Sequence, residues 1–263
     1  MKERLDVLLV RRGLCSSRER AKDAIRAGQV RVGGRPELRP GREVEETAEL
    51  KLEGETLHYV SRGGLKLEKA LDVFGVDPAG LVCLDCGAST GGFTDCLLQR
   101  GALRVYALDV GTSQLAERLR NDPRVVSMER TNARDLKPGD LPEAPGLAAV
   151  DVSFISLRLI LPALVPLLAP EGEAVCLIKP QFEAGRARVG KGGVVRSREV
   201  HKQVLEELLA FFPAAGLYPA GLTWSPVRGG DGNLEYLCHL RRKAGTRPPE
   251  VSGIVEEAYR ELK

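Results

Sequence analysis

The apolar residues follow two different patterns, one in the N-terminal part of the chain and one in the rest. In the N-terminal part, helical spacing predicts a helix from Leu5 to Val10, which Gly13 is placed to end. A second short helix is predicted after Ser16, which resembles a helix cap; it contains Ala21, Ala24 and Ile25 and ends near Gly28. Residues 30–32 alternate as in a short strand. These few elements predict a small α+β domain.

From Leu65 onward, short apolar runs alternate with amphipathic helices. Helices are predicted over residues 65–74, 157–168 and 199–212. The strands are predicted at residues 81–86, 104–109, 125–129, 148–154, 173–179, 217–224 and 234–240. Alternating strands and helices form mostly parallel sheets covered by helices on both faces, so we predict an α/β fold for this part.

The change of pattern also predicts the domain boundaries. The polar segment that ends in Gly63 and Gly64 is typical of a joint between domains. We expect a small domain at residues 1–58, a linker at 59–64, an α/β domain at 65–242 and a C-terminal tail with a short helix at 243–263.

Composition excludes several classes of protein. The 263 residues are 43% hydrophobic and 29% charged, which excludes a chain disordered throughout. The longest apolar run, residues 157–169, contains Arg158 and two prolines and is shorter than a membrane span. The first residues lack the pattern of a secretory signal. We therefore expect a cytoplasmic protein without a membrane segment, and the patterns indicate no oligomeric state.

The six cysteines are scattered, which argues against a disulfide framework. Cys83 and Cys86 have the spacing of a metal or redox pair, but they lie inside an apolar run with no second pair and no histidine nearby. We interpret them as two buried strand residues and predict no metal site.

Positive charge is concentrated near the N-terminus. Residues 1–42 contain twelve Lys and Arg against five Asp and Glu, although the formal net charge of the whole chain is only +3. Arg18, Lys22 and Arg26 are spaced to line one helix face, which suits contacts with phosphates. The alternative is a solvated surface that happens to be rich in arginine.

The N-terminal stretch RLDVLLVRRGLCSSRERAKDAIRAGQVRVGG, residues 4–34, resembles the RNA-binding module named after the fourth protein of the small ribosomal subunit. The resemblance implies an αL-type fold that binds structured RNA through its basic helix face and does no chemistry. The residues of this part that we predict to bind RNA are Arg4, Arg18, Arg20, Lys22, Arg26 and Arg62.

A glycine-rich turn, Gly87–Thr94, joins the first strand of the α/β domain to a helix. Glycine lets the backbone approach a ligand, so this arrangement is typical of nucleotide sites. The pattern Asp85-x-Gly87-x-x-x-Gly91-Gly92 is neither the dinucleotide fingerprint nor a P-loop. It resembles the first motif of Rossmann-like methyltransferases, which cradles the amino-acid end of S-adenosylmethionine. The alternative is a turn that only links strand to helix.

The second strand ends in Asp109, where an acid would bind a ribose diol, or else cap a helix. In the family that the glycine turn resembles, the turn after the third strand contacts the adenine. The residues predicted to bind S-adenosylmethionine are Asp85, Gly87, Ala88, Ser89, Gly91, Gly92, Phe93, Asp109, Asn132, Ala133 and Asp151.

Charged residues interrupt three of the apolar strands. Asp151 and Lys179 follow apolar runs at the carboxyl ends of their strands, where doubly wound sheets bind ligands, and Glu235 lies in the last strand. A buried charge is costly unless it is paired, so each is either functional or part of a structural ion pair between strands.

With Lys66, these residues resemble the Lys-Asp-Lys-Glu tetrad of FtsJ-type ribose 2′-O-methyltransferases. The pattern Arg62-x-x-x-Lys66-Leu67 favours Lys66 over Lys69 as the tetrad member. Together with the RNA-binding module, the chain to residue 242 is similar to the TlyA family.

The family resemblance implies a Rossmann-like methyltransferase sheet, parallel with one antiparallel strand. It also implies S-adenosylmethionine-dependent methylation of a cytidine ribose in 16S or 23S ribosomal RNA, so that ribosomal RNA or ribosomal subunits are the expected partners. The hypothesis for the catalytic residues is that Lys179 acts as the base or orients the oxygen, and that Lys66 is a second cation. Asp151 would then orient Lys179 and lie near the sulfonium, and Glu235 would position Lys66.

A basic, glycine-rich segment, residues 183–193, follows the second lysine of the tetrad. We predict that it is mobile and closes over RNA; the alternative is an ordinary surface loop. Its predicted RNA-binding residues are Arg186, Arg188 and Lys191.

Three other functions compete with the ribose methyltransferase. Methyltransferases that act on exocyclic amines usually carry Asp/Asn-Pro-Pro-aromatic where this chain has Asp151-Val152-Ser153-Phe154, and the two lysines would have no role. A pore-forming haemolysin needs membrane segments that the sequence does not show. A non-catalytic RNA-binding factor with a vestigial methyltransferase domain is disfavoured by the intact turn and tetrad.

Overall fold

The computed structural model describes residues 2–15, 18–26, 28–53, 58–190, 192–229, 232–245 and 249–262. The chain divides into two compact units, Met1–Arg62 and Gly63–Lys263, each described here by itself. The first unit carries the basic N-terminal part of the sequence and the second carries the glycine turn and the candidate tetrad.

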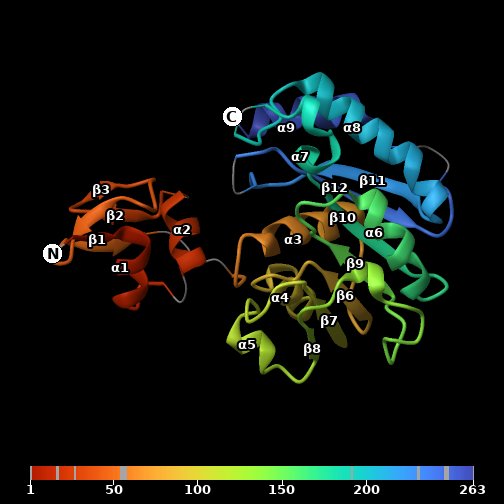
Figure 1. The fold of residues 1–263 in the computed structure, drawn as a ribbon, viewed down its shortest axis with the longest axis horizontal. Coiled ribbons are helices and arrows are strands. Elements are labelled where there is room, and N and C mark those ends of the chain that lie inside the picture. The colour runs from red at the N-terminus through yellow and green to blue at the C-terminus, as the bar shows by residue number, and fades with distance from the viewer. Residues whose placement is uncertain are drawn as a thin grey trace. The chain divides into compact units, whose positions relative to one another are not determined.

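The first unit packs two helices against short strands (Figure 1). Its elements are β1 (Lys2–Arg4), α1 (Leu5–Arg11), α2 (Arg18–Arg26), β2 (Val30–Val32), β3 (Arg35–Pro36), β4 (Glu43–Glu45) and β5 (Leu50–Leu52). Strand β1 pairs with β4, and β2 lies between β3 and β5. The apolar faces of α1 and α2 meet in a core that includes Leu5, Leu8 and Ile25, all fully buried.

The second unit is built around one seven-stranded sheet. Its strands are β6 (Val82–Cys86), β7 (Arg104–Leu108), β8 (Val125–Met128), β9 (Leu147–Val150), β10 (Glu173–Ile178), β11 (Tyr218–Trp224) and β12 (Tyr236–Arg241). Its α-helices are α3 (Gly63–Phe74), α4 (Gly92–Gln99), α5 (Glu117–Arg120), α6 (Leu157–Leu164), α7 (Pro180–Glu183), α8 (Arg198–Phe211) and α9 (Val251–Glu261). Its 3-10 helices are η1 (Ala133–Asp135), η2 (Val165–Leu167), η3 (Arg186–Arg188) and η4 (Phe212–Ala215).

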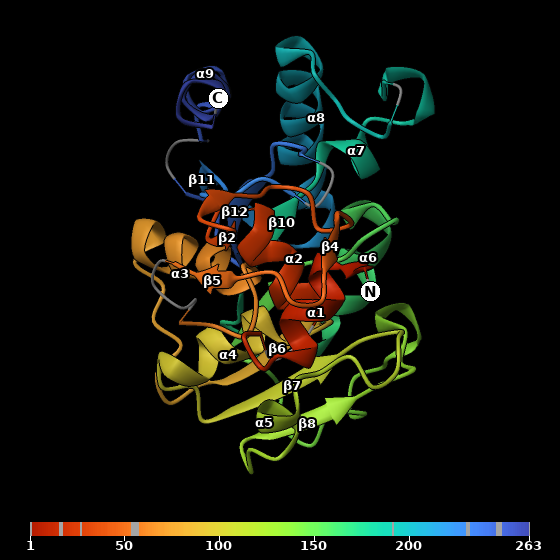
Figure 2. The same ribbon diagram turned by 90° about the vertical axis from the view of Figure 1, so that its left-hand side faces the viewer.

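The strand order across the sheet is β11-β12-β10-β9-β6-β7-β8. In Figure 2 the labelled strands run in this order, from β11 near the top to β8 near the bottom. Strand β12 is antiparallel to both of its neighbours, and the other pairings are parallel. A parallel sheet with one antiparallel strand confirms the predicted fold class.

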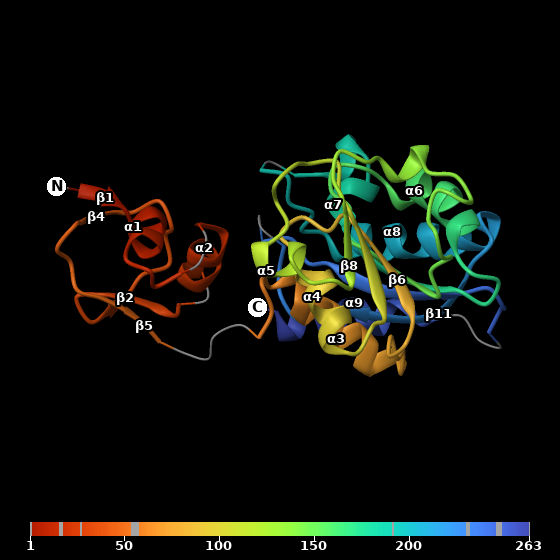
Figure 3. The same cartoon turned by 90° about the horizontal axis from the view of Figure 1, so that it is seen from below.

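Helices cover both faces of the sheet. Helices α3 and α4 pack against each other on one side, while α6 and α8 contribute to the apolar core on the other side (Figure 3). Helix α9 packs against α8 and β11. Strands β6, β7, β9 and β10 are parallel, so their carboxyl ends share one edge. The strand order changes direction between β6 and β9, and such sheets bind ligands at this point of that edge.

Several element ends differ from the sequence prediction for local reasons. Helix α3 begins at Gly63, so it includes the two glycines that we assigned to the linker. Strand β9 ends at Val150 instead of residue 154, because the chain turns away and Phe154 has a left-handed φ of 64°. The predicted helix over residues 157–168 changes to 3-10 geometry after Leu164, where Pro166 has no N–H to continue the α-helical bonding.

Within the described ranges, no helix combines the length and the apolar composition that crossing a membrane requires.

Leu161 of α6 tests the packing of this helix on the sheet. Its side chain is fully buried in the core of the second unit, whereas Leu159 on the same helix is 57% exposed. Leu161→Ala should lower the free energy of unfolding by about 2–5 kcal/mol because it leaves a cavity. Leu159→Ala, the matched control, should change it by less than about 1 kcal/mol. Denaturant unfolding measures both, and equal losses would contradict this packing.

Candidate active site

The glycine turn brings the ends of two strands into contact. Gly87 has a φ of 94°, and a Cβ built on it would overlap the backbone carbonyl of Asp151, with that carbonyl carbon 2.9 Å away. Gly91 also has a positive φ, 95°, at the start of α4. Only glycine adopts these backbone angles freely. Because Gly87 has no Cβ, the turn lies directly against the end of β9.

Asp85, at the end of β6, bonds the last residue of the glycine turn. Its side chain is fully buried, and Oδ2 accepts hydrogen bonds from the backbone N–H (2.8 Å) and the hydroxyl (2.6 Å) of Thr94. No described residue bonds Oδ1. Burial raises the pKa of Asp85 to about 7, although the hydrogen bonds from Thr94 oppose the shift. Asp85 therefore fixes the start of α4 and leaves one carboxylate oxygen for another partner.

Asp109 ties the second strand to the same turn. Its two carboxylate oxygens accept the backbone N–H groups of Ser89 and Gly111, each at 2.7 Å. Two carboxylates, those of Asp85 and Asp109, thus accept hydrogen bonds from the backbone of the glycine turn.

A cavity of about 500 Å³ opens at the carboxyl ends of β6, β7 and β9; we call it the main cavity. Six of the residues predicted to bind the cofactor line it: Gly87, Ser89, Asp109, Asn132, Ala133 and Asp151. The other five lie outside its lining: Asp85, Ala88, Gly91, Gly92 and Phe93. The volume is within the range of small-molecule sites.

The first pair of tetrad residues joins α3 to the start of β12. Lys66 Nζ donates to Glu235 Oε2 at 2.5 Å, and the two residues are 9% and 2% exposed. A Cβ on Gly229 would lie 2.5 Å from Glu235 Oε1, so a glycine makes room for this carboxylate. The buried lysine therefore has a buried carboxylate as partner.

The second pair lies at the ends of β9 and β10. Lys179 Nζ forms an ion pair with Asp151 Oδ1 at 2.6 Å and donates to Ser153 Oγ at 2.8 Å. Asp151 and Ser153 also line the main cavity. Ile178 of β10 pairs with Tyr236 of β12. Lys179 follows Ile178 and Glu235 precedes Tyr236, so Lys179 and Glu235 lie at the same end of these two strands. The structure thus brings all four tetrad residues to one edge of the sheet.

An exposed aromatic side chain marks the mouth of the main cavity. Phe154 is 89% exposed and has the left-handed φ of 64°, which is strained for a bulky side chain. Its ring lies 5.0 Å from that of Phe182, measured between centroids.

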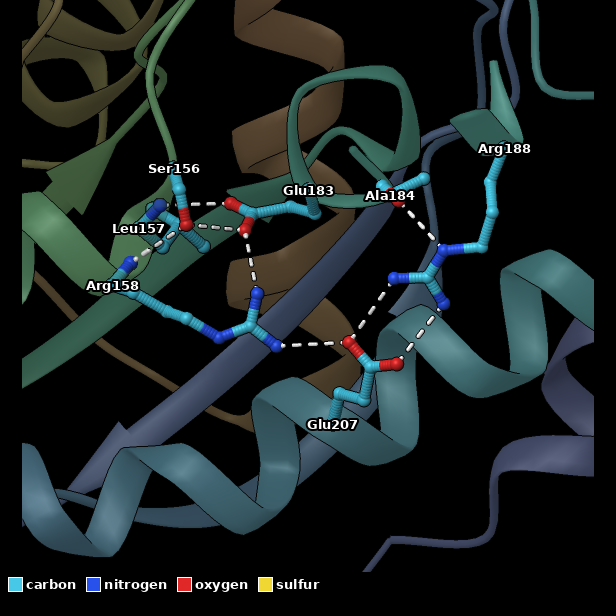
Figure 4. A network of polar contacts seen from close by, with 7 residues as sticks. All are labelled: Ser156, Leu157, Arg158, Glu183, Ala184, Arg188 and Glu207. Carbon is cyan, nitrogen blue, oxygen red and sulfur yellow. Dashed lines mark hydrogen bonds and ion pairs between the residues drawn. The ribbon is translucent and has the colours of Figure 1, made fainter. Parts of the chain in front are cut away.

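A network of polar contacts holds the segments that carry these residues (Figure 4). Glu183, at the end of α7, accepts from Ser156 Oγ at 2.6 Å and from the Leu157 N–H at 2.8 Å, at the start of α6. Arg158 and Arg188 both pair with Glu207 of α8. The segments after β9 and β10 are therefore fixed to each other and to α8.

The predicted RNA-binding cations have different surroundings. Arg4 and Arg18 both pair with Asp6, whose side chain is fully buried, and Arg62 pairs with Asp23. Arg188 is engaged by Glu207 and donates to the Ala184 carbonyl. Arg26 and Arg186 are exposed, and Lys22 is half-buried. The side chain of Arg20 and the whole of Lys191 lie outside the described residues.

Sequence reasoning missed Ser153 and Phe154 as site residues. Ser153 contacts Lys179, and Phe154 stands at the mouth of the main cavity. The one available signal was their position directly after Asp151, which the strand predicted to residue 154 concealed. Thr131 and Arg134, which also line the main cavity, lie in the predicted adenine turn beside Asn132 and Ala133.

The strand order, the glycine turn after the first strand and the cavity at the carboxyl ends define the second unit as a Rossmann-like methyltransferase domain. Comparison with known families agrees with this class: residues 59–242 match the FtsJ-like methyltransferase family, and residues 3–50 match the S4 domain. The chain belongs to the TlyA family of FtsJ-like methyltransferases, which confirms the resemblance noted in the sequence.

Several relatives match nearly the whole chain. The chain is 52% identical to YqxC of Bacillus subtilis, a candidate rRNA methyltransferase, over 100% of this chain and 96% of that protein. It is 44% identical to the 16S/23S rRNA (cytidine-2′-O)-methyltransferase TlyA of Mycobacterium tuberculosis, over 98% and 97%. A solved structure of a candidate hemolysin from Streptococcus thermophilus is 48% identical, with a TM-score of 0.80 over 99% and 97% of the two chains.

Gly87→Ala tests the contact between the glycine turn and β9. Gly139→Ala is the matched control, because Gly139 has a similar φ of 97° but nothing within 4 Å of a built Cβ. Both variants should lose about 1–2 kcal/mol to the left-handed backbone. Gly87→Ala should lose roughly 1–3 kcal/mol more, because its methyl group meets the Asp151 carbonyl. Denaturant unfolding compares the two, and equal losses would exclude the close approach.

Asp85→Asn tests the buried carboxylate. Because folding raises the pKa of Asp85, the folded state holds the proton more tightly, and stability falls as pH rises towards about 7. The variant lacks this loss, so its stability relative to the native protein should increase by roughly 2 kcal/mol between pH 5 and pH 7. Denaturant unfolding followed by the fluorescence of Trp224, the single tryptophan, measures this difference.

Asp122→Asn is the control for that experiment. Hydrogen bonding to Arg124 lowers the pKa of Asp122, so its contribution to stability is lost only at more acidic pH. The difference between this variant and the native protein should be flat from pH 5 to pH 7. A flat difference for Asp85→Asn as well would show that Asp85 is already ionised at pH 5.

Proposed function

We propose that this protein methylates the 2′-hydroxyl of a cytidine ribose in ribosomal RNA, with S-adenosylmethionine as methyl donor and Lys66, Asp151, Lys179 and Glu235 as its catalytic residues. One observation carries the proposal. Two residues in the wall of the main cavity, Asp151 and Ser153, also hold the ammonium group of Lys179. A buried cation is thus held beside a cavity of cofactor size.

The residues present fit S-adenosylmethionine. Gly87 and Ser89 of the glycine turn line the main cavity, Asp109 follows the second strand where a ribose diol would bind, and Asn132 and Ala133 also line this cavity. The free Oδ1 of Asp85 is a buried acceptor beneath the same turn. When bound, the cofactor would supply a methyl group on a sulfonium, a good leaving group.

Lys179 would hold the attacking oxygen. An ammonium group has three N–H donors, and here Asp151 and Ser153 take up two directions around Nζ. The third would bond the ribose 2′-oxygen and keep it in line with the methyl carbon. As the 2′-oxygen takes the methyl group and the methyl–sulfur bond breaks, the hydroxyl proton would pass to a solvent water molecule. Lys66, fixed by Glu235, would add a second positive charge that stabilises the oxygen as it loses the proton.

The substrate assignment rests on the first unit and on the relatives. Residues 3–50 match the S4 domain, and Arg18 and Arg26 of α2 are exposed, as phosphate contacts require. The TlyA protein of Mycobacterium tuberculosis is named for cytidine 2′-O-methylation of 16S and 23S rRNA. Phe154 at the cavity mouth would stack on the base of the target nucleotide. Action on ribosomal RNA would place the protein in the cytoplasm.

Lys179→Met tests the proposed chemistry. The substitution keeps the aliphatic stem and removes the ammonium group, so kcat for methyl transfer from labelled S-adenosylmethionine to unmethylated ribosomal subunits should fall by about 10²–10⁴-fold. Binding of the cofactor, measured by calorimetry, should be retained. Lys137→Met is the matched control, because Lys137 is exposed and outside the site. A native rate in Lys179→Met would end the proposal, as would methyl label found on a base instead of a ribose.

A further inference from the structure

A second cavity, of about 470 Å³, adjoins the main cavity and shares Phe154 with it. We call it the aromatic pocket. Its lining residues are Phe154, Gln181, Phe182, Gly185, Arg186, Val189, Gly190 and Gly193. It therefore lies between the segment that follows β9 and the segment that follows β10.

Gln181 is the polar group of this pocket whose hydrogen bonding is incomplete. Its Oε1 is buried and has no hydrogen-bond partner among the described residues. Buried amide groups in folded proteins are nearly always hydrogen-bonded, because losing water without a replacement is costly. An amide left this way in the wall of a cavity is suited to a ligand that supplies the missing bonds.

The backbone around Gln181 is held firmly. Helix α7 carries the residue between Lys179, its N-terminal cap, and Glu183, its last residue. Glu183 is bonded to Ser156 and Leu157, as Figure 4 shows, and Lys179 is held by Asp151 and Ser153. The contacts of Lys179 and Glu183 thus fix the backbone of α7, which carries Gln181, and recognition of a ligand requires such a fixed backbone.

The other walls of the aromatic pocket suit a nucleobase. Phe154 and Phe182 present two rings at 47° to each other, and base–aromatic stacking is a general mode of binding unpaired nucleotides. Arg186 is exposed and has no carboxylate partner in the part of the chain that the structure describes, so it is available for a phosphate.

We propose that Gln181 reads the target base: its amide hydrogen-bonds the edge of the nucleobase that stacks on Phe154, while the ribose reaches Lys179. A glutamine amide offers one acceptor and one donor side by side. The amino group and ring nitrogen N3 of cytosine offer a donor and an acceptor in the matching arrangement, as adenine does to glutamine in DNA. Uracil presents the reverse order at the same edge and would need the amide flipped, with Nε2 in the place of the buried Oε1. Purines would have to enter the same space with a second ring. This inference rests on the proposed function.

The test compares base preference in native protein and variants. Ribosomal subunits are reconstituted from transcribed RNA that carries C, U, A or G at the position methylated by the native protein. For native protein, kcat/KM should be highest with C. In Gln181→Leu, which keeps the volume and removes the amide, kcat/KM with C should fall about tenfold or more, and the ratio between C and the other bases should shrink. The KM for S-adenosylmethionine should stay unchanged.

Gln203→Leu is the matched control, because Gln203 is exposed on α8 and should affect neither value. Unchanged base preference in Gln181→Leu would overturn the inference and leave the proposed function standing. An equal loss with all four bases would also overturn it, since that result indicates a general effect on the site. If native protein methylates no ribose in these subunits, the proposed function fails and this inference fails with it.

Discussion

The arrangement of the site depends on neutralising two lysines that the fold buries at one edge of the sheet. Lys66 and Lys179 are each 9% exposed, and a buried ammonium group without a partner is costly. Glu235 and Asp151 supply the partners, at 2.5 and 2.6 Å. Because the four residues come from α3 and from the ends of β9, β10 and β12, the ion pairs also join segments that are far apart in the chain. The same contacts therefore hold the edge together and leave a cation beside the main cavity.

A second set of buried carboxylates fixes the segments around this edge. Asp85 holds the start of α4 through Thr94, and Glu183 holds the start of α6 through Ser156 and the Leu157 N–H. Each carboxylate satisfies backbone or hydroxyl donors at a helix start, where N–H groups have no partner in the helix. The main cavity and the aromatic pocket thus have walls made of fixed turns, which is the condition for holding a reacting oxygen in line.

The class of the fold and most of the candidate site were readable from the sequence. Apolar runs separated by amphipathic helices predicted the sheet, and charged residues after apolar runs predicted Asp151 and Lys179 as site residues. Boundaries were less accurate where tertiary contacts decide them: β9 ends at Val150, and α3 begins at Gly63, two residues before its predicted start. The charge pattern of the first unit also implied more cations available for RNA than the structure leaves, because Arg4 and Arg18 both pair with the buried carboxylate of Asp6. A count of charges does not show which of them are already paired.

The sequence by itself determined the order of strands and helices, the glycine turn and the residues whose charge does not suit a core, because periodicity and the cost of burial act locally. The tertiary structure decided which lysine meets which carboxylate, that Ser153 joins Lys179, and that the amide oxygen of Gln181 is left without a described partner in an aromatic pocket. These contacts depend on the strand order and on the packing of α3 against β12, which brings Lys66 and Glu235 together across 169 positions of the chain. No local pattern encodes a contact over that separation.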